Sequence, residues 1–300
     1  MFDALSASEN TRQYGAKLLL FGEHTVQLKG DALAVPLKIL SGRWKKNEPI
    51  IIDERLAAFA DFISSKSREC YLPFDTEKFA NDVRSGWFFE SDILEGYGVG
   101  SSGAVTAAVF DTYKTDNIEN ANVLKKVLAL LESYFHGTSS GIDPIVIYTE
   151  QAVRIKKGDL ALMPDFATPL SVFLIDTNMP RSAKTYIEIF LEKYKNADFN
   201  HFIQNQFMPC VDSAIQSWLN NDAENVWRAV SQISVHQFIE FRELIPPHFL
   251  PLWLDGLKSE AFKLKLCGAG GGGYILCFGR NTEKIESVLN GYNLNYKRAF

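Results

Sequence analysis

A short glycine-rich run constrains the local fold more than any other segment of this 300-residue chain. It reads Gly-Ala-Gly-Gly-Gly-Gly over residues 268–273, between the apolar segments 262–267 and 273–278. Each glycine in a helix or strand costs roughly 0.5–1 kcal/mol relative to alanine, so four in succession do not continue a regular element. The run is predicted to be a loop between two strands where a ligand or another backbone segment approaches closely. A flexible hairpin loop is the alternative.

The composition is that of a soluble globular protein and excludes several classes. Hydrophobic residues make up 46% of the chain, charged residues make up 22%, and the formal net charge is −5. A net acidic chain argues against general nucleic-acid binding, which needs a basic face. We find no signal-peptide pattern and no apolar run of the roughly 18–20 residues that cross a bilayer, so we expect a cytoplasmic protein without a membrane partner. The four cysteines lack metal-ligand spacing and are predicted to be free thiols.

Strand-like and helix-like patterns are mixed along the chain, which favours an α+β protein of two domains. Segment 158–169 carries two prolines and is predicted to be a loop at the domain boundary, so we expect domains at 1–167 and 168–300. The expected strands are 16–22, 32–39, 87–93, 143–150, 153–157 (as hairpin partner of 143–150), 171–177, 262–267, 273–278 and 294–299. The expected helices are 53–68, 101–113, 118–134, 182–195, 201–220, 223–243 and 281–290.

A second glycine-rich segment, 95–110, leads into a predicted helix. Three alternating glycines precede Ser-Ser-Gly, and the free amides at such a helix start form an anion site together with the helix dipole, while a serine hydroxyl can bind Mg²⁺. The alternative is a glycine-rich turn with a serine N-cap. The segment matches neither the P-loop, because no lysine precedes the serines, nor the dinucleotide-binding pattern. The predicted phosphate-binding residues are Gly96, Gly98, Gly100, Ser101, Ser102 and Gly103.

Three charged side chains complete a set that phosphoryl transfer requires. Lys17 begins an apolar strand, Glu132 lies on a predicted helix, and Asp143 precedes a proline. Each taken alone is an ordinary solvated charge or turn residue. Taken together, Ser102 and Glu132 can hold Mg²⁺ against a polyphosphate. Asp143 can orient or deprotonate an attacking hydroxyl, and Lys17 can stabilise charge on the transferred group.

Five stretches resemble, in order, the signature motifs of the GHMP kinase superfamily, with the greatest similarity to mevalonate kinases. They are 17–24, 98–103, 132–143, 176–181 and 268–273, so the resemblance extends over nearly the whole chain. The glutamate and the aspartate that bound the third stretch have the spacing found in mevalonate kinases. The second stretch departs from the motif, since glycine stands at its last position where alanine is usual.

The resemblance implies two α+β halves, the first ribosomal-protein-like and the second ferredoxin-like, with the active site in the cleft between them. It implies an ATP- and Mg²⁺-dependent kinase that transfers the γ-phosphate to a primary hydroxyl, with mevalonate as the acceptor and 5-phosphomevalonate as the product. Phosphomevalonate, a sugar or homoserine could instead be the acceptor, and an inactive member that binds a metabolite or a protein is a further reading. The expected partner is a small molecule, with no nucleic acid, and a homodimer is left open.

Carried onto matching positions, the resemblance implies a role for each motif residue. Asp143 becomes the catalytic carboxylate with Lys17 as its partner, and Ser102 and Glu132 become Mg²⁺ ligands. The glycines and serines of 96–103 become the triphosphate loop. The residues expected beside the substrate are Glu23, His24, Arg181, Gly270 and Gly271.

Overall fold

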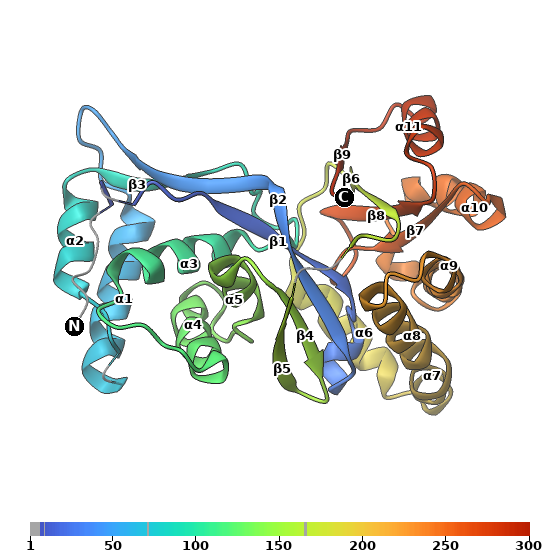
Figure 1. The fold of residues 1–300 in the computed structure, drawn as a ribbon, viewed down its shortest axis with the longest axis horizontal. Coiled ribbons are helices and arrows are strands. Elements are labelled where there is room, and N and C mark those ends of the chain that lie inside the picture. The colour runs from blue at the N-terminus through green and yellow to red at the C-terminus, as the bar shows by residue number, and fades with distance from the viewer. Residues whose placement is uncertain (1–6, 9, 71, 165–166) are drawn as a thin grey trace. The chain divides into compact units, whose positions relative to one another are not determined.

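The computed structural model describes residues 7–8, 10–70, 72–164 and 167–300 (Figure 1). Within this part of the chain the fold is α+β with two antiparallel sheets. The chain divides into two units, each built from separate stretches. Unit 1 takes in residues up to 17, 36–94 and 99–151, and unit 2 takes in 18–35, 95–98 and 152–300. The predicted domain boundary after residue 167 stays a prediction.

Unit 1 is built around a buried helix of small residues. Its elements are the start of β1 (Tyr14–Phe21), the end of β2 (Ala32–Lys46), α1 (Glu54–Cys70), α2 (Thr76–Arg84), β3 (Trp87–Ser91), α3 (Ser101–Tyr113), α4 (Ala121–His136) and α5 (Ile142–Thr149). Ala104, Ala107 and Ala108 of α3 are completely buried, and their small side chains let α4 and α5 pack closely against this helix. β3 pairs antiparallel with the end of β2.

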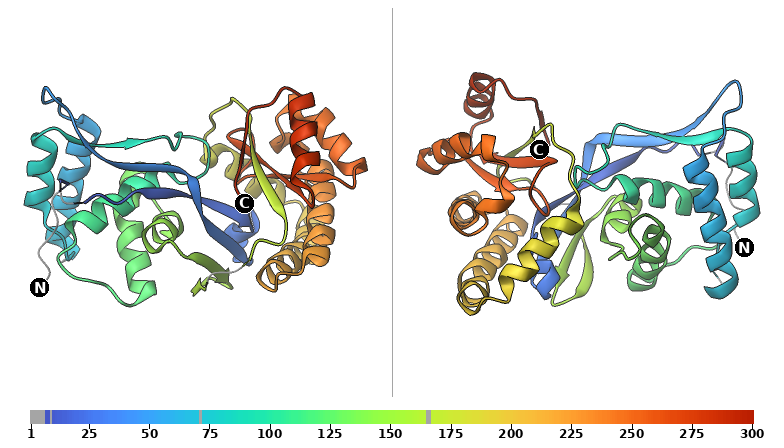
Figure 2. Two further views of the ribbon diagram at one scale, coloured as in Figure 1. Left: turned by 45° about the horizontal axis from the view of Figure 1, so that its top comes forward. Right: turned by 180° about the vertical axis from the view of Figure 1, so that it is seen from behind.

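Unit 2 contains a four-stranded sheet in the order β7-β8-β6-β9, with helices packed against it. The strands in unit 2 are β4 (Ala152–Lys156), β5 (Asp159–Met163), β6 (Ser171–Asp176), β7 (Phe262–Leu266), β8 (Tyr274–Gly279) and β9 (Tyr296–Arg298). Its helices are η1 (Thr25–Leu28), α6 (Ala183–Tyr194), α7 (Ala197–Phe202), η2 (Ile203–Phe207), α8 (Met208–Leu219), α9 (Ala223–Glu240), η3 (Arg242–Leu244), η4 (Pro247–Phe249), α10 (Leu250–Lys258) and α11 (Thr282–Gly291). α9 and α10 pack on β7, and α8 lies beside α9 in each view (Figures 1 and 2).

Most predicted elements are confirmed to within a few residues, including β1, β3, α1, α3, α4, β6 to β9, α6, α9 and α11. β2 runs to Lys46 instead of ending near residue 39, and the predicted helix 201–220 is the continuous run of α7, η2 and α8. Two nine-residue helices, α2 and α10, were not predicted. α2 buries only Phe79 and Val83, which is too short an apolar pattern to read, and α10 contains a proline and a glycine.

The prediction of a strand at 143–150 is wrong, because these residues form the helix α5. The isoleucines and valine suggested a strand, but Pro144 lies in the first turn of a helix, where the missing amide hydrogen has no cost. Gly141 precedes the helix with a left-handed φ of 71°, which starts the turn. Burial against α3 then outweighs the strand preference of the β-branched residues. Asp143 consequently lies in the first turn of a helix.

The prediction that 158–169 is a loop throughout is also wrong. β5 occupies Asp159–Met163 and pairs antiparallel with β4, so 153–157 is a strand whose hairpin partner is β5 and not 143–150. The two-residue connection is Lys157 and Gly158, with φ of 53° and 91°. Two positive φ values are typical of the turn that joins tight hairpins. β4 also pairs with the first residues of β2.

Cys210, Cys267 and Cys277 are not in disulfide bonds, as predicted, whereas the side chain of Cys70 lies outside the described residues. No helix in the described ranges is long and apolar enough to cross a membrane.

Candidate active site

The predicted pairing of Lys17 and Asp143 is present in unit 1. Lys17 is the last residue of β1 in this unit, and its amide donates a hydrogen bond to the carbonyl of Val99 at 2.9 Å. Its Nζ atom lies 2.9 Å from Oδ1 of Asp143, which stands in the first turn of α5. The lysine side chain is 9% exposed and the aspartate side chain is 31% exposed, so a buried cation meets a carboxylate that solvent or a ligand can reach.

The start of α3 lies against this ion pair. Gly100 is the N-cap, with a left-handed φ of 86°, and no side chain caps the helix, so the serine N-cap alternative is wrong. A Cβ atom at Gly100 would lie 3.0 Å from Cγ of Lys17. A Cβ atom at Gly103 would lie 2.9 Å from Cβ of Asp143, which explains glycine where the superfamily motif usually has alanine. The first helical hydrogen bond runs from the amide of Ala104 to the carbonyl of Gly100, which leaves the amides of 101–103 to other acceptors.

Ser102 and Glu132 are also brought together as predicted. Oγ of Ser102 donates to Oε1 of Glu132 at 3.0 Å, and the Ser139 hydroxyl donates to Oε2. Glu132 is 4% exposed. Burial, followed by the charge of Asp143, raises the pKa of the Glu132 carboxyl to about 7, against the hydrogen bonds from Ser139 and Ser102 and the charge of Lys17. A nearby divalent cation would favour the ionised carboxylate, because opposite charge favours the charged form.

Ser102 and Glu132 fit a Mg²⁺ ion both in the chemistry of their oxygen atoms and in the distance between those atoms. A hydroxyl and a carboxylate supply the hard oxygen ligands that Mg²⁺ prefers. Two oxygens on neighbouring corners of a Mg²⁺ octahedron with bonds of ~2.1 Å lie about 3 Å apart, which agrees with the 3.0 Å between Ser102 Oγ and Glu132 Oε1. Over the ranges that the structure describes, no group of three or more His, Cys, Asp or Glu side chains could hold a metal. Mg²⁺ commonly takes one or two protein ligands together with water and phosphate oxygens.

His136 joins this cluster although the sequence analysis gave it no role. Its Nε2 atom lies 2.9 Å from Oγ of Ser102. The contact resembles a nucleophile and its base, but the carboxylate of Glu132 is bonded to the serine and not to the imidazole. A catalytic triad requires the acid to orient the imidazole, so this geometry does not support one. The signal was available in the sequence, since Glu132 and His136 are four residues apart on one helix.

In unit 2, Glu23 belongs to a buried ion pair. Its Oε2 atom lies 2.6 Å from Nζ of Lys265, and both side chains are at most 2% exposed. Gln237 donates to Oε1 of Glu23 at 2.7 Å and accepts from the amide of Leu266 at 2.9 Å. Burial raises the pKa of the Glu23 carboxyl, against the charge of Lys265. These contacts tie the segment that follows β1 to β7, and the prediction that Glu23 lies beside the substrate stays a prediction.

His24, also predicted beside the substrate, is held between aromatic rings. Its ring centroid lies 5.0 Å from that of Phe190 and 5.2 Å from that of Phe241. Nε2 lies 3.2 Å from the carbonyl oxygen of Ala269, so the neutral ring donates there and Nδ1 is the acceptor. Nδ1 is buried without a hydrogen-bond partner among the described residues. Burial lowers the pKa of His24 to about 4.

The lowered pKa predicts a pH-dependent loss of stability. Between pH 6.5 and about 4, the His24 imidazole takes up a proton in the unfolded protein but not in the folded protein. The free energy of unfolding therefore falls as the pH falls. The contribution of His24 reaches about 3 kcal/mol near pH 4, from a pKa difference of about 2.5 units. Urea unfolding of the wild type and of His24→Phe at pH 7, 6 and 5 measures it. The phenylalanine variant should lose less stability per pH unit, and equal slopes would contradict the assignment.

Arg181 is a half-buried guanidinium without a carboxylate partner in the described part of the chain. Its Nη2 atom donates to the carbonyl of Cys267 at 3.3 Å, and its amide donates to the carbonyl of Gly96 at 3.2 Å. A Cβ atom at Gly98 would lie 2.5 Å from Nη2, and one at Gly268 would lie 2.8 Å from it. Because glycine has no Cβ atom, Gly98 and Gly268 leave the space that the guanidinium of Arg181 occupies. Burial lowers the pKa of Arg181, which is typical of a cation that lacks a counterion.

The glycine run connects β7 and β8, as predicted, and it is held by hydrogen bonds, against the flexible-loop alternative. The amide of Gly271 donates to the carbonyl of Leu244 at 2.6 Å, and that of Gly273 donates to the carbonyl of Met179 at 2.7 Å. A Cβ atom at Gly270 would lie 2.8 Å from the carbonyl oxygen of Leu244, and one at Gly271 would lie 1.9 Å from the ring of Tyr186. Neighbouring backbone and an aromatic ring thus fill the space that side chains would need.

Gly273→Ala is expected to be strongly destabilising. Gly273 has φ of 69°, and an added Cβ would lie 2.7 Å from the carbonyl oxygen of Tyr97, a backbone atom that cannot swing away. Left-handed strain and overpacking together cost about 3 kcal/mol or more. Gly158→Ala is the control, since Gly158 has φ of 91° with open space around it and should lose only about 1 kcal/mol. Urea unfolding of both variants gives the difference, and equal losses would contradict the close approach.

The structure thus gathers the predicted residues in two groups. Unit 1 brings Lys17, Gly100, Ser101, Ser102, Gly103, Glu132 and Asp143 together at the starts of α3 and α5. Unit 2 contains Glu23, His24, Gly96, Gly98, Arg181, Gly270 and Gly271. The predicted phosphate loop is therefore divided between the units after residue 98.

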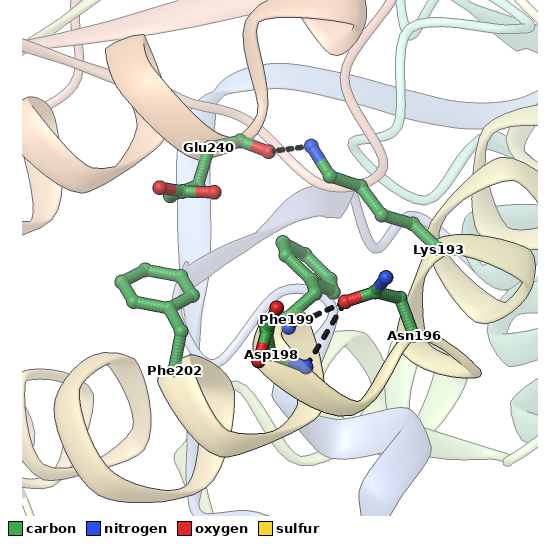
Figure 3. A pocket seen from close by; sticks show the side chains of 6 residues that line it. All are labelled: Lys193, Asn196, Asp198, Phe199, Phe202 and Glu240. Carbon is green, nitrogen blue, oxygen red and sulfur yellow. Dashed lines mark hydrogen bonds between the residues drawn. The ribbon is translucent and has the colours of Figure 1, made fainter.

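A hollow of about 410 Å³ lies elsewhere in unit 2, between α6, α7 and α9 (Figure 3). None of the predicted site residues lines it. Lys193 at its rim already contacts the carbonyl of Glu240 and the carboxylate of Glu243, and its ammonium lies 4.7 Å from the ring centroid of Phe199. We assign no ligand to this hollow.

No protein-family model matches the chain. The mevalonate kinase of Dictyostelium discoideum is 23% identical over 358 residues, covering 95% of this chain and 92% of that protein. The crystal structure of L. major mevalonate kinase in complex with R-mevalonate matches with a TM-score of 0.69 at 14% identity, covering 99% of this chain and 98% of that one. Streptococcus pneumoniae phosphomevalonate kinase in complex with phosphomevalonate and AMPPNP matches with a TM-score of 0.68 at 13% identity, covering 96% and 99%.

These matches confirm the predicted resemblance. They cover nearly the whole chain, and each of the three proteins is a small-molecule kinase by name. The chain therefore has the fold of the GHMP kinases.

Proposed function

We propose that this protein is a GHMP kinase that uses ATP and Mg²⁺ to phosphorylate a primary hydroxyl of a small hydroxy acid, and that the acid is mevalonate. The observation that carries the proposal is the Lys17–Asp143 ion pair, 2.9 Å long, beside a helix start that no side chain caps. A carboxylate for the acceptor hydroxyl, a cation for the transferred group and free amides for phosphate oxygens are what phosphoryl transfer needs.

Each group in unit 1 then has a role in the reaction. The amides of residues 101–103 and the positive end of the α3 dipole bind the phosphates of ATP. Asp143 orients the acceptor hydroxyl and accepts its proton as the new oxygen–phosphorus bond forms and the bond to ADP breaks. Lys17 holds Asp143 in place and stabilises negative charge on the phosphoryl group. Mg²⁺, held by Ser102 and Glu132, would neutralise charge on the phosphate oxygens.

One group in unit 2 supports an acid as the acceptor. Arg181 has its guanidinium beside Gly98 and Gly268 and no carboxylate partner in the described residues, so a substrate carboxylate can supply the missing charge. A sugar would instead need several contacts with Asn, Asp and Glu side chains. The L. major kinase, solved with R-mevalonate, has a similar fold and agrees with this choice.

Phosphomevalonate is the principal competing acceptor, because the S. pneumoniae kinase that binds it has a similar fold. Its additional phosphate would call for more than one cation near the acceptor. A sugar or homoserine as acceptor would keep the kinase activity, whereas an inactive member of the superfamily would bind a metabolite or a protein without turnover.

The experiment that tests the function is an acceptor panel. The full chain is incubated with ATP and Mg²⁺ and with mevalonate, phosphomevalonate, galactose or homoserine, and ADP formation is followed by a coupled assay. We expect turnover with mevalonate at least about tenfold above the other three in kcat/KM. Turnover with another acceptor alone would correct the substrate. No turnover with any of them, in a protein that still binds nucleotide, would favour the inactive member.

Arg181→Met should separate acid recognition from catalysis. Loss of one charge-assisted pair costs about 1.5–3 kcal/mol, so KM for mevalonate should rise at least about tenfold while KM for ATP changes by less than about twofold. Arg280→Met is the control, since that exposed arginine pairs with Glu224 at 2.7 Å and lies over the ring of Trp227. An unchanged KM for mevalonate in the Arg181 variant would remove Arg181 from the substrate site.

A further inference from the structure

One contact at the start of α3 has no role in the proposed reaction. Nε2 of His136 lies 2.9 Å from Oγ of Ser102, across 34 residues of sequence. His136 is the last residue of α4, and Glu132 lies one turn earlier on the same helix, so both side chains reach Ser102 from one helix face. Glu132 is buried, whereas His136 is exposed. Two side chains of different chemistry thus meet one hydroxyl.

The Ser102 hydroxyl has a single proton and donates it to one acceptor at a time. Oε1 of Glu132 lies 3.0 Å and Nε2 of His136 lies 2.9 Å from Oγ of Ser102. Nε2 competes with Oε1 for the proton when the imidazole carries its hydrogen on Nδ1, and it donates to Oγ when the hydrogen is on Nε2. When the hydroxyl proton points at Glu132, the hydrogen bond joins Oγ of Ser102 and Oε1 of Glu132, the same two oxygens that fit Mg²⁺. A proton directed at His136 leaves lone pairs on Oγ of Ser102 and on Oε1 of Glu132 free for a cation.

The rest of the network restricts the choice to these two acceptors. The Ser139 hydroxyl donates to Oε2 of Glu132, and the amide of Gly141 donates to Oγ of Ser139 at 2.9 Å. The second carboxylate oxygen is therefore already engaged, and the carboxylate presents Oε1 to Ser102. The orientation of the hydroxyl proton then depends on whether His136 offers an acceptor.

We propose that His136 is a positioning residue for the metal site. Its neutral imidazole, with the proton on Nδ1, accepts the Ser102 hydroxyl proton at Nε2 and so turns the lone pairs of Ser102 toward the cation. The inference rests on the proposed function, because it requires a kinase that binds its nucleotide together with Mg²⁺. His136 touches neither substrate nor metal and acts only through Ser102.

Calorimetric titration of the full chain with ADP, with Mg²⁺ and separately with excess chelator, tests the proposal. The variants are His136→Phe, which keeps a ring but has no acceptor, and His136→Gln, whose amide oxygen restores one. A hydrogen bond of about 1–1.5 kcal/mol corresponds to about a tenfold change in affinity. We expect His136→Phe to weaken Mg²⁺-dependent ADP binding about tenfold, to leave metal-free binding within twofold, and to be rescued to within about threefold by His136→Gln. Mn²⁺ binding followed by electron paramagnetic resonance gives the same comparison on the metal itself.

Three results would overturn the proposal. They are an unchanged Mg²⁺-dependent affinity in His136→Phe, an equal loss with and without metal, and a failure of His136→Gln to recover affinity. The side chain is exposed, and unfolding midpoints within about 2 °C of the wild type confirm that all variants fold. If His136→Phe falls outside that limit, His136→Gln against His136→Ala makes the same comparison. A wild type that binds ADP equally with and without Mg²⁺ contradicts the proposed function, whereas a metal-dependent wild type with insensitive variants contradicts this inference alone.

Discussion

Replacing Asp143 with asparagine is expected to lower kcat for phosphoryl transfer by about 10³-fold while the affinity for Mg²⁺–ATP changes by less than about threefold. The amide cannot accept the proton of the acceptor hydroxyl, and it carries no negative charge to pair with the ammonium of Lys17, which lies 2.9 Å from Oδ1 in the wild type. Nucleotide binding uses the backbone amides at the start of α3, which the substitution leaves in place. Steady-state kinetics gives kcat, and calorimetry with a non-hydrolysable ATP analogue gives the affinity.

Glu90→Gln is the matched control for the aspartate variant. Glu90 is also in unit 1 and pairs with Lys45 at 3.0 Å, but this pair is exposed and belongs to β2 and β3. Surface ion pairs contribute about 0–1 kcal/mol, so kcat should stay within about twofold of the wild type. If Asp143→Asn retained more than about a tenth of the wild-type kcat, Asp143 would not be the carboxylate that handles the acceptor hydroxyl.

Replacing Lys17 with methionine is expected to lower kcat by about 10²–10³-fold, with a smaller effect on nucleotide affinity. Methionine retains an apolar stem in a site where the lysine side chain is 9% exposed, so the packing beneath Gly100 is kept and only the charge is lost. Asp143 is left without its partner, but it is partly exposed and solvent can stabilise it. The folded fraction is checked by urea unfolding before kcat is compared.

The double variant tests whether the two residues act as a unit. Residues in contact couple, so Lys17→Met added to Asp143→Asn should lower kcat by less than about tenfold beyond Asp143→Asn alone. A double variant whose loss equals the product of the two single losses would show that Lys17 and Asp143 act independently. The ion pair would then be a structural contact without a shared role in transfer.

Helical periodicity of the apolar residues predicted α1 and α9. Apolar composition predicted α3, β7 and β8, most of whose residues are buried. The reading failed at α5, because its buried run of four residues, 144–147, is too short to show a period. It failed at β5 because the prolines of 158–169 indicated a loop, whereas the Lys157–Gly158 turn, with its positive φ values, joins two strands.

Two predicted pairs of side chains meet within unit 1. Lys17 contacts Asp143, and Ser102 contacts Glu132, across sequence separations that no local pattern encodes. The needs of phosphoryl transfer suggested these pairings, and the resemblance to the GHMP kinases implied a role for each residue. Lys265 was missed, because a lysine in an apolar strand reads as a solvated charge until tertiary structure buries it against Glu23.

Phosphorus nuclear magnetic resonance of a reaction containing the full chain, ATP, Mg²⁺ and mevalonate detects the proposed transfer of a phosphoryl group from ATP to a primary hydroxyl. We expect equimolar ADP and one new phosphomonoester signal, coupled to the protons of an adjacent methylene group. ADP and inorganic phosphate without a phosphomonoester, or an unchanged ATP spectrum with every acceptor of the panel, would contradict the proposed function.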